Sequence, residues 1–108
     1  MREADMTLDQ WEALREQTGG LLSATECAEL AHWAREAGRC DALEVGHYTG
    51  LSTVVLLHGL TDGSRLTTID HHKGDNYVQA SDQKVFLKNV VQALNGNPIM
   101  LEVIARDF

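Results

Sequence analysis

The sequence predicts an α/β fold, in which a parallel sheet of three strands forms half of a doubly wound architecture and two helices precede it. Three short apolar segments, at 42–46, 66–70 and 99–105, have the length and composition of buried strands. A helical pattern separates each strand from the next, which is typical of parallel sheets. Because such crossovers are right-handed, we expect the strands to be parallel and in the order 3-2-1.

Two capping boxes predict the helices that precede the sheet. Thr7-Leu-Asp-Gln10 begins the first helix, and the glycines at 19 and 20 end it. Ser23-Ala-Thr-Glu26 begins the second helix in the same way, and Gly38 ends it. Both helices therefore have a defined start and a defined stop in the sequence.

The helices between the strands differ in character. The segment 50–60 is apolar on almost every side, which predicts a helix buried within the molecule. Ser81 or Asp82 can cap the other helix, and Asn95-Gly96 ends it. Its apolar residues follow the helical period of 3.6, as expected for a helix with one face on a core.

Length and composition narrow the class of protein. The chain has 108 residues, which fits one small domain, and 44% of them are apolar. The formal charge of −7 disfavours binding to nucleic acids, whose phosphates would be repelled. No apolar run is long enough to span a membrane, and the acidic first residues are unlike a secretory signal. We therefore expect a cytoplasmic protein.

The two tryptophans and two cysteines have no spacing that indicates chemistry. Cys27 and Cys40 form neither a CxxC pair nor a zinc motif, so we expect them to be reduced packing residues. Trp11 and Trp33 are expected to pack the first two helices. His47, His71 and His72 lack a clear fourth ligand, and no metal site is predicted.

A glycine loop follows the first predicted strand, where open α/β sheets bind their ligands. Its sequence is Glu44-Val-Gly-His-Tyr-Thr-Gly-Leu-Ser-Thr53. Leu51 stands where a phosphate-binding P-loop requires lysine, so binding of nucleoside triphosphates is disfavoured. Tyr48 stands where the dinucleotide fingerprint requires its second glycine, which leaves a dinucleotide-binding half-domain as a weaker alternative.

The loop resembles the first motif of class I S-adenosylmethionine-dependent methyltransferases, in the branch that acts on small molecules as O-methyltransferases. The resemblance covers residues 23–108 and includes Ile69-Asp-His-His-Lys-Gly-Asp75 and Phe86-Leu-Lys-Asn89. It implies a Rossmann-like half-domain over 23–108, which stops after the third strand, with residues 1–22 as a leading helix. The implied cofactor is S-adenosylmethionine, and the implied partner is a small-molecule methyl acceptor.

The resemblance also implies a set of cofactor-binding residues, while no catalytic residue can be named. Asp70 lies 20 residues beyond Gly50, the interval expected for an acid that binds ribose, although it could instead cap nearby amides. Ser52 would bind the cofactor carboxylate or cap its helix. The full set is Glu44, Gly46, Tyr48, Gly50, Ser52, Asp70, His71 and Asp107.

The first strand has consequences for assembly. In the order 3-2-1 it lies at an edge, and Ala42-Leu-Glu-Val-Gly46 contains no proline or lysine that would protect that edge. We therefore expect a homo-oligomer. The alternative to an enzyme is a truncated or non-catalytic module that binds S-adenosylmethionine or serves oligomerisation.

Overall fold

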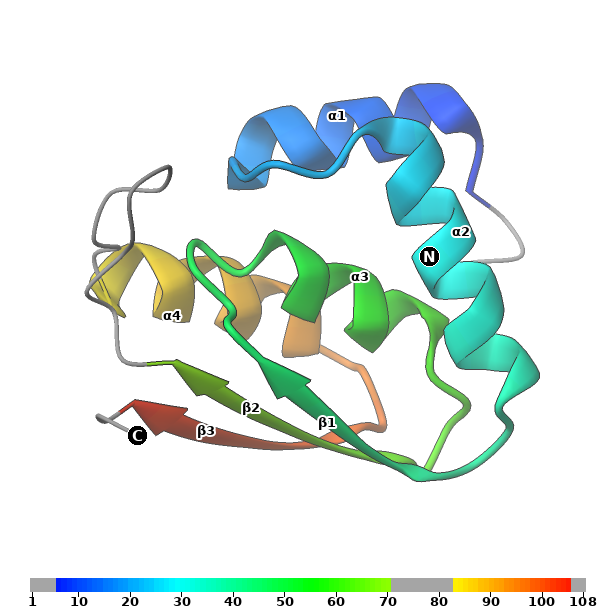
Figure 1. The fold of residues 1–108 in the computed structure, drawn as a ribbon, viewed down its shortest axis with the longest axis vertical. Helices are drawn as coiled ribbons and strands as arrows, with labels where there is room; N and C mark the ends of the chain where they lie inside the picture. Colours follow the sequence, from blue (N-terminus) through cyan, green and yellow to red (C-terminus); the bar gives the residue numbers. More distant parts are fainter. Residues whose placement is uncertain (1–5, 71–82, 106–108) are drawn as a thin grey trace.

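In the described part of the chain, two helices come first, and strands and helices then alternate as the sequence predicts. The computed structural model describes residues 6–70 and 83–105. In chain order the elements are α1 (Leu8–Thr18), α2 (Ala24–Glu36), β1 (Asp41–Val45), α3 (Leu51–Gly59), β2 (Arg65–Asp70), α4 (Gln83–Leu94) and β3 (Met100–Ala105) (Figure 1). The predicted caps Ser81 and Asp82 of α4 lie outside the described residues.

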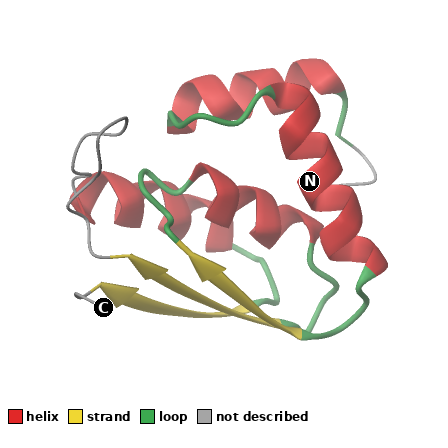
Figure 2. Cartoon of the chain, in the orientation of Figure 1, coloured by secondary structure: helices red, strands yellow, loops and turns green. Residues whose placement is uncertain are grey.

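The sheet confirms the predicted order and direction of the strands. β2 is central and pairs in parallel with β1 on one side and with β3 on the other. In this register Glu44 of β1 lies beside Thr68 of β2, one residue pair before the strands end. All four helices lie on the same side of the sheet (Figure 2).

Two apolar clusters hold the layers together. One lies between the sheet and the helices α3 and α4, and its largest members are Leu57, Leu60, Leu66 and Phe86. The other joins α1, α2 and α3 around Trp11, as predicted for this tryptophan.

The expectation for Trp33 is wrong. Its side chain is 63% exposed, and its indole nitrogen donates a hydrogen bond to Glu29 at 3.1 Å on the outer face of α2. The residues of α2 that do pack inward are Cys27, Ala31 and Ala34. The inward face of this helix is therefore made of small side chains, which lets it approach α3 closely.

The other face of the sheet is uncovered within the described residues. Leu43 and Val45 of β1 are 69% and 62% exposed on that face, and Met100 of β3 is also exposed. Parallel sheets are normally covered on both faces, so this apolar surface is unusual. None of the helices in the described ranges is both long and apolar enough to cross a membrane.

Candidate functional site

The loop between β1 and α3 continues the sheet for one residue and then turns sharply. The amide of Gly46 donates to the carbonyl of Ile69 at 2.7 Å, and the amide of Gly50 donates back to the carbonyl of His47 at 2.7 Å. Gly46, Tyr48 and Gly50 all have positive φ, at 85°, 44° and 99°. Glycine adopts such angles without strain, whereas tyrosine does not, so the surroundings must fix Tyr48.

Asp70 supplies the anchor for this loop. One oxygen of its carboxylate accepts hydrogen bonds from the amides of His47 and Tyr48, both at 2.8 Å. The side chain is buried at the carboxyl end of β2. Bonds to an ionised acceptor are stronger than neutral ones, so this carboxylate holds the strained turn in place. The amide-capping role considered for Asp70 is therefore present in the structure.

Glu44 lies at the centre of a buried hydroxyl network. Its carboxylate accepts hydrogen bonds from the hydroxyls of Ser52 and Thr53, at the start of α3, and from that of Thr68 at 2.7 Å. No lysine or arginine in the described part of the chain pairs with it. Ser52 thus donates to Glu44, and no side chain makes a cap hydrogen bond at the N-terminus of α3.

His47 is buried in the core, although it also contributes to the lining of the pocket described below. Its side chain is 2% exposed and stacks on Phe86 of α4, with ring centroids 3.8 Å apart. Its Nδ1 lies 2.8 Å from the hydroxyl of Thr68. Because that hydroxyl donates its hydrogen to Glu44, Nδ1 must carry the proton and donate to Thr68.

A pocket of about 170 Å³ opens between this loop and the linker that joins α1 to α2. The hydroxyl of Thr49 is buried in its wall and has no hydrogen-bond partner. Leu51 and Ser52, the first residues of α3, also line the pocket, and the N-terminus of a helix without a side-chain cap favours an anionic group. The lining residues are Gly20, Leu21, Leu22, Gly46, His47, Tyr48, Thr49, Leu51 and Ser52.

Gly46 and Gly50 serve different purposes in this arrangement. A Cβ added to Gly46 would meet no atom within 4 Å and would project into open space. One added to Gly50 would lie 3.0 Å from the ring of Phe86, so this glycine allows α4 to pack on the loop. Gly46 therefore leaves open space beside the loop, whereas Gly50 allows Phe86 to pack closely against it.

The predicted site residues fall into three groups. Gly46, Tyr48 and Ser52 line the pocket. Glu44, Gly50 and Asp70 lie behind it and hold its wall. His71 and Asp107 lie outside the described residues.

Sequence reasoning missed several residues of the site. Thr49 and the linker residues Gly20, Leu21 and Leu22 line the pocket, and Thr68 completes the hydroxyl network. The sequence did contain a signal for Thr68. Side chains alternate between the two faces of a strand, so Thr68 of β2 is expected on the same buried face as Leu66.

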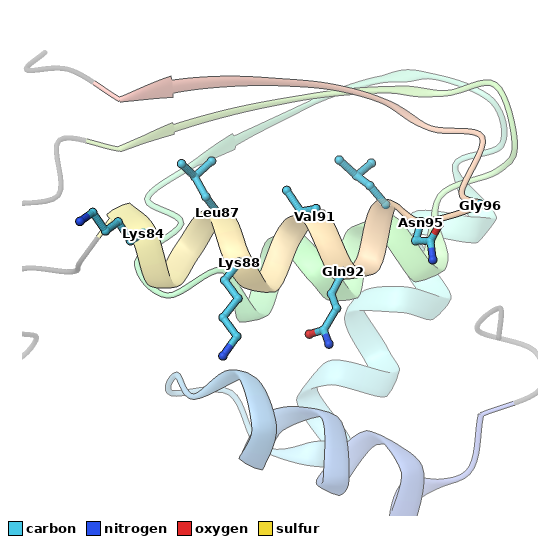
Figure 3. A pocket seen from close by; sticks show the side chains of 8 residues that line it. Lys84, Leu87, Lys88, Val91, Gln92, Asn95 and Gly96 are labelled. Carbon is cyan, nitrogen blue, oxygen red and sulfur yellow. The ribbon is translucent and has the colours of Figure 1, made fainter.

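A larger hollow of about 980 Å³ lies along α4, away from the loop. Figure 3 shows Leu87 and Val91 on the flank toward the sheet, and Lys88 and Gln92 on the opposite flank. It is an open, mostly apolar helix surface without converging polar groups. Its size alone does not make it the functional site, since ligand sites combine concavity with placed polar groups.

The comparisons with known proteins fit this geometry. The sequence matches no protein-family model and no curated protein. A protein of Klebsiella pneumoniae assigned as an O-methyltransferase has a similar structure, with 20% identity and a TM-score of 0.58 over 90% of this chain and 42% of that one.

Two further similar structures were solved as complexes with small molecules. The O-methyltransferase from Bacillus cereus, in complex with SAH, has 21% identity and a TM-score of 0.58 over 89% of this chain and 40% of that one. TomG from Streptomyces achromogenes, an O-methyltransferase involved in tomaymycin synthesis and solved with SAM, has 20% identity and a TM-score of 0.56 over 92% of this chain and 43% of that one.

These similar structures show which fold the chain has and how much of each structure it corresponds to. The chain spans about two fifths of the length of each of these proteins. The Rossmann-like half-sheet with two leading helices, predicted from the sequence, is confirmed. The chain therefore has a Rossmann-like fold, similar to about two fifths of each of these structures.

Proposed function

We propose that this chain is the cofactor-binding part of an S-adenosylmethionine-dependent methyltransferase that acts on a small molecule. The observation that carries the proposal is the loop at residues 46–50. It leaves open space above Gly46, ends at the uncapped N-terminus of α3, and is braced from below by Asp70. A ligand with a carboxylate and a nearby ribose matches these features.

The amino-acid end of the cofactor is the part that fits the pocket. Sites for whole ligands of this size enclose about 300–1,000 Å³, whereas this pocket encloses about 170 Å³. The amides of α3 would bind the carboxylate, and the orphaned hydroxyl of Thr49 would gain a partner. The remainder of the cofactor would extend over Gly46.

The ammonium group of the cofactor has a candidate counter-charge in Glu44. Its buried carboxylate has hydroxyl donors but no cationic partner among the described residues. An unpaired buried charge is costly, and a bound cation would offset part of that cost. Ser52, which lines the pocket and donates to Glu44, would link the two groups.

Asp70 would bind the ribose hydroxyls while it continues to hold the loop. This carboxylate stands at the carboxyl end of β2, 20 residues beyond Gly50, the interval expected for an acid that binds ribose, and one of its oxygens accepts from the loop amides. Tyr48, held beside this carboxylate, would cover the cofactor, and His71 and Asp107 are proposed as further contacts.

The bound cofactor would supply an electrophilic methyl group on a sulfonium centre. The residues of this chain would bind and orient it and exclude water, which are the contributions that a protein makes to cofactor chemistry. Among the residues that line the pocket, only His47 and Tyr48 have titratable side chains, and the ring of His47 is buried against Phe86. The methyl acceptor would therefore be a small molecule bound by residues beyond this pocket.

A second candidate is a cofactor-binding module without catalysis. It is favoured by the pocket lining, in which the titratable side chains are those of His47 and Tyr48 and the ring of His47 is buried against Phe86. A methyl-transfer assay with a panel of phenols and amines separates the two, because the module would bind cofactor and transfer nothing.

Calorimetric titration tests the proposed binding directly. The 108-residue chain should bind S-adenosylhomocysteine with one site per chain, and NAD should give no heat of binding. Binding of NAD, or no binding of S-adenosylhomocysteine by the folded chain, would remove the proposal.

We propose further that the chain associates with itself through β1. This strand pairs only with β2 in the described sheet, and its outward residues Leu43 and Val45 are exposed. An edge strand with exposed apolar residues is a template for another chain. The proposed dimer would join two sheets at this edge.

The proposed location is the cytoplasm. Cys27 and Cys40 are both free thiols, as expected in a reducing compartment. Burial raises the pKa of the Cys27 thiol, which keeps it protonated and unreactive.

A further inference from the structure

The side chain of Asn89, in the middle of α4, joins two segments that are distant in the sequence. Its amide nitrogen donates a hydrogen bond to the carbonyl of Thr18 at 3.2 Å and another to the carbonyl of Thr49 at 2.9 Å. Thr18 is the last residue of α1, and Thr49 belongs to the loop before α3. Both partners are carbonyl oxygens, which fixes the amide orientation, since the reversed one would place oxygen against oxygen.

The pocket has two walls, the linker between α1 and α2 and the loop before α3, and each of these carbonyls belongs to one of these segments or directly precedes it. Thr18 leads directly into the linker that supplies Gly20, Leu21 and Leu22, and Thr49 is itself a wall residue. Asn89 does not line the pocket. Its side chain contacts the backbone of the loop wall at Thr49 and the backbone at Thr18, just before the linker wall begins.

Little else fixes the distance between α1 and α4. The facing residues of the two helices, among them Leu14, Gln17 and Gln92, border a hollow of about 320 Å³ rather than a packed interface. The carbonyl of Thr18 also stands in the last turn of α1, where carbonyls lack a partner within the helix. The hydrogen bond from Asn89 therefore acts where packing is weak.

We propose that Asn89 is a positioning residue that sets the separation of the two walls of the pocket. This inference rests on the proposed function for its ligand, because the pocket is the part assigned to the amino-acid end of the cofactor. Asn89 would then determine selectivity for that end. Binding of the adenosine end, which would lie over Gly46 and Asp70, does not depend on it.

The test compares Asn89→Asp with Asn97→Asp in the 108-residue chain. Asn97 is a matched control, because its amide nitrogen also donates to a backbone carbonyl, that of Leu57 at 2.7 Å, and neither of these residues lines the pocket. Both variants replace a donor by an acceptor of the same shape. The pair Asn89→Ala and Asn97→Ala repeats the comparison without added charge, in case a carboxylate at position 89 prevents folding.

Hydrogen exchange of the ligand-free chains gives the first readout. Loss of the Asn89 bonds should speed exchange about tenfold in both segments 19–22 and 46–50, the factor that corresponds to one lost hydrogen bond. The Asn97 variants should leave these two segments unchanged relative to the rest of the chain. If only one segment loosens, or if both sets of variants behave alike, the proposal is overturned.

Ligand selectivity gives the second readout. The Asn89 variants should bind S-adenosylhomocysteine about tenfold more weakly than the wild type, and 5′-methylthioadenosine within about twofold of it. An equal loss for both ligands would mean general destabilisation and would overturn the positioning role. If the wild type binds neither ligand, the proposed function fails, and hydrogen exchange alone decides the role of Asn89.

Discussion

At Asp70, the same carboxylate is proposed to serve the protein and its ligand. Its bonds to the amides of His47 and Tyr48 exist in the chain without a ligand. Removing the carboxylate therefore affects the fold of the loop as well as any ribose contact. The two effects can be measured separately.

We expect Asp70→Ala to lower the free energy of unfolding by about 1–3 kcal/mol, because two loop amides lose their acceptor. Urea unfolding measures this effect. The same variant should weaken binding of S-adenosylmethionine by about 1.5–3 kcal/mol, the range for hydrogen bonds to a charged group. Unchanged affinity in the folded variant would remove the ribose assignment.

At Gly46, backbone strain and ligand obstruction can be separated with a control. Gly46 and Gly38 both have positive φ, and an added Cβ would meet no atom within 4 Å at either position. Each change to alanine should therefore cost about 1–2 kcal/mol of stability. Only Gly46→Ala should also weaken binding of S-adenosylhomocysteine in calorimetry, and Gly46→Val should abolish it. Equal affinities of the Gly46 and Gly38 variants would contradict the loop model.

The residue roles were only partly predictable from the sequence. The glycine pattern of the loop predicts the open space at Gly46, and the interval between Gly50 and Asp70 predicts that Asp70 lies beside the loop. That Ser52 and Thr53 would turn toward Glu44 does not follow, because it depends on Thr68 of the neighbouring strand sharing the same carboxylate. A contact of this kind is set by strand register, which the local sequence does not contain.

At the scale of elements, both leading helices begin with a capping box, but the residue at position N3 of the box differs between them. Thr7 pairs with Gln10 at α1, and Ser23 pairs with Glu26 at α2. The backbone amide of Ser23, and then its hydroxyl, hold the pKa of Glu26 below its ordinary value of 4.5. Of the two box residues Gln10 and Glu26, only Glu26 can be protonated by acid.

We expect the free energy of unfolding of the wild type to fall relative to that of Glu26→Gln on acidification. A lowered folded-state pKa gives stability that is present above the ordinary value of 4.5 and is lost as the pH falls through the folded-state pKa. Urea unfolding of both proteins between about pH 6 and pH 3 measures the difference, in which other titrating groups cancel. Parallel curves for the two proteins would contradict it.

The crossing of α2 over α3 depends on Gly59. A Cβ at this position would lie 2.6 Å from the carbonyl oxygen of Ala31 and 2.7 Å from its Cα, and backbone atoms cannot move aside cheaply. Glycine to alanine within a helix normally stabilises by about 1 kcal/mol. Here we expect Gly59→Ala to destabilise by about 1–3 kcal/mol in thermal or urea unfolding, as overpacking does. A stabilised variant would show that the helices separate freely.

The elements themselves were highly predictable because each carries its own signal. Capping boxes begin α1 and α2 at Thr7 and Ser23 as expected, and Gly19 ends α1. Which face of α2 packs was less predictable. Trp33 is large and apolar, yet the close approach to Gly59 admits only small residues such as Ala31.

At the scale of the whole molecule, the uncovered sheet governs behaviour in solution. We expect the isolated chain to dimerise, exchange segments or aggregate at micromolar concentration, because the edge and outer face of β1 are apolar. Size-exclusion chromatography with light scattering measures this. Leu43→Lys together with Val45→Lys should shift the chain toward monomer, since both side chains are exposed and lie outside the core.

A surface substitution of the same kind controls for added charge. Leu21→Lys also places a lysine at an exposed apolar position, but away from the sheet. It should leave the association unchanged. A stable wild-type monomer with strongly protected amides throughout 41–45 would contradict self-association through β1.

The parallel topology also has a consequence for how this chain folds in time. Asp41 of β1 pairs with Arg65 of β2, and α3 lies between them in the sequence. Arg65 in turn pairs with Met100 of β3, with α4 between them, so no described strand pairing is a local hairpin. Each pairing requires the closure of a long loop, which costs conformational entropy before the strands gain any contact. Folds with such distant contacts form more slowly than folds with local contacts. Asp70 and the amides of His47 and Tyr48 are brought together by the same closure that joins β1 to β2. Competence to bind should therefore arise in the slow phase of refolding, together with the sheet, and not with the earlier formation of helices.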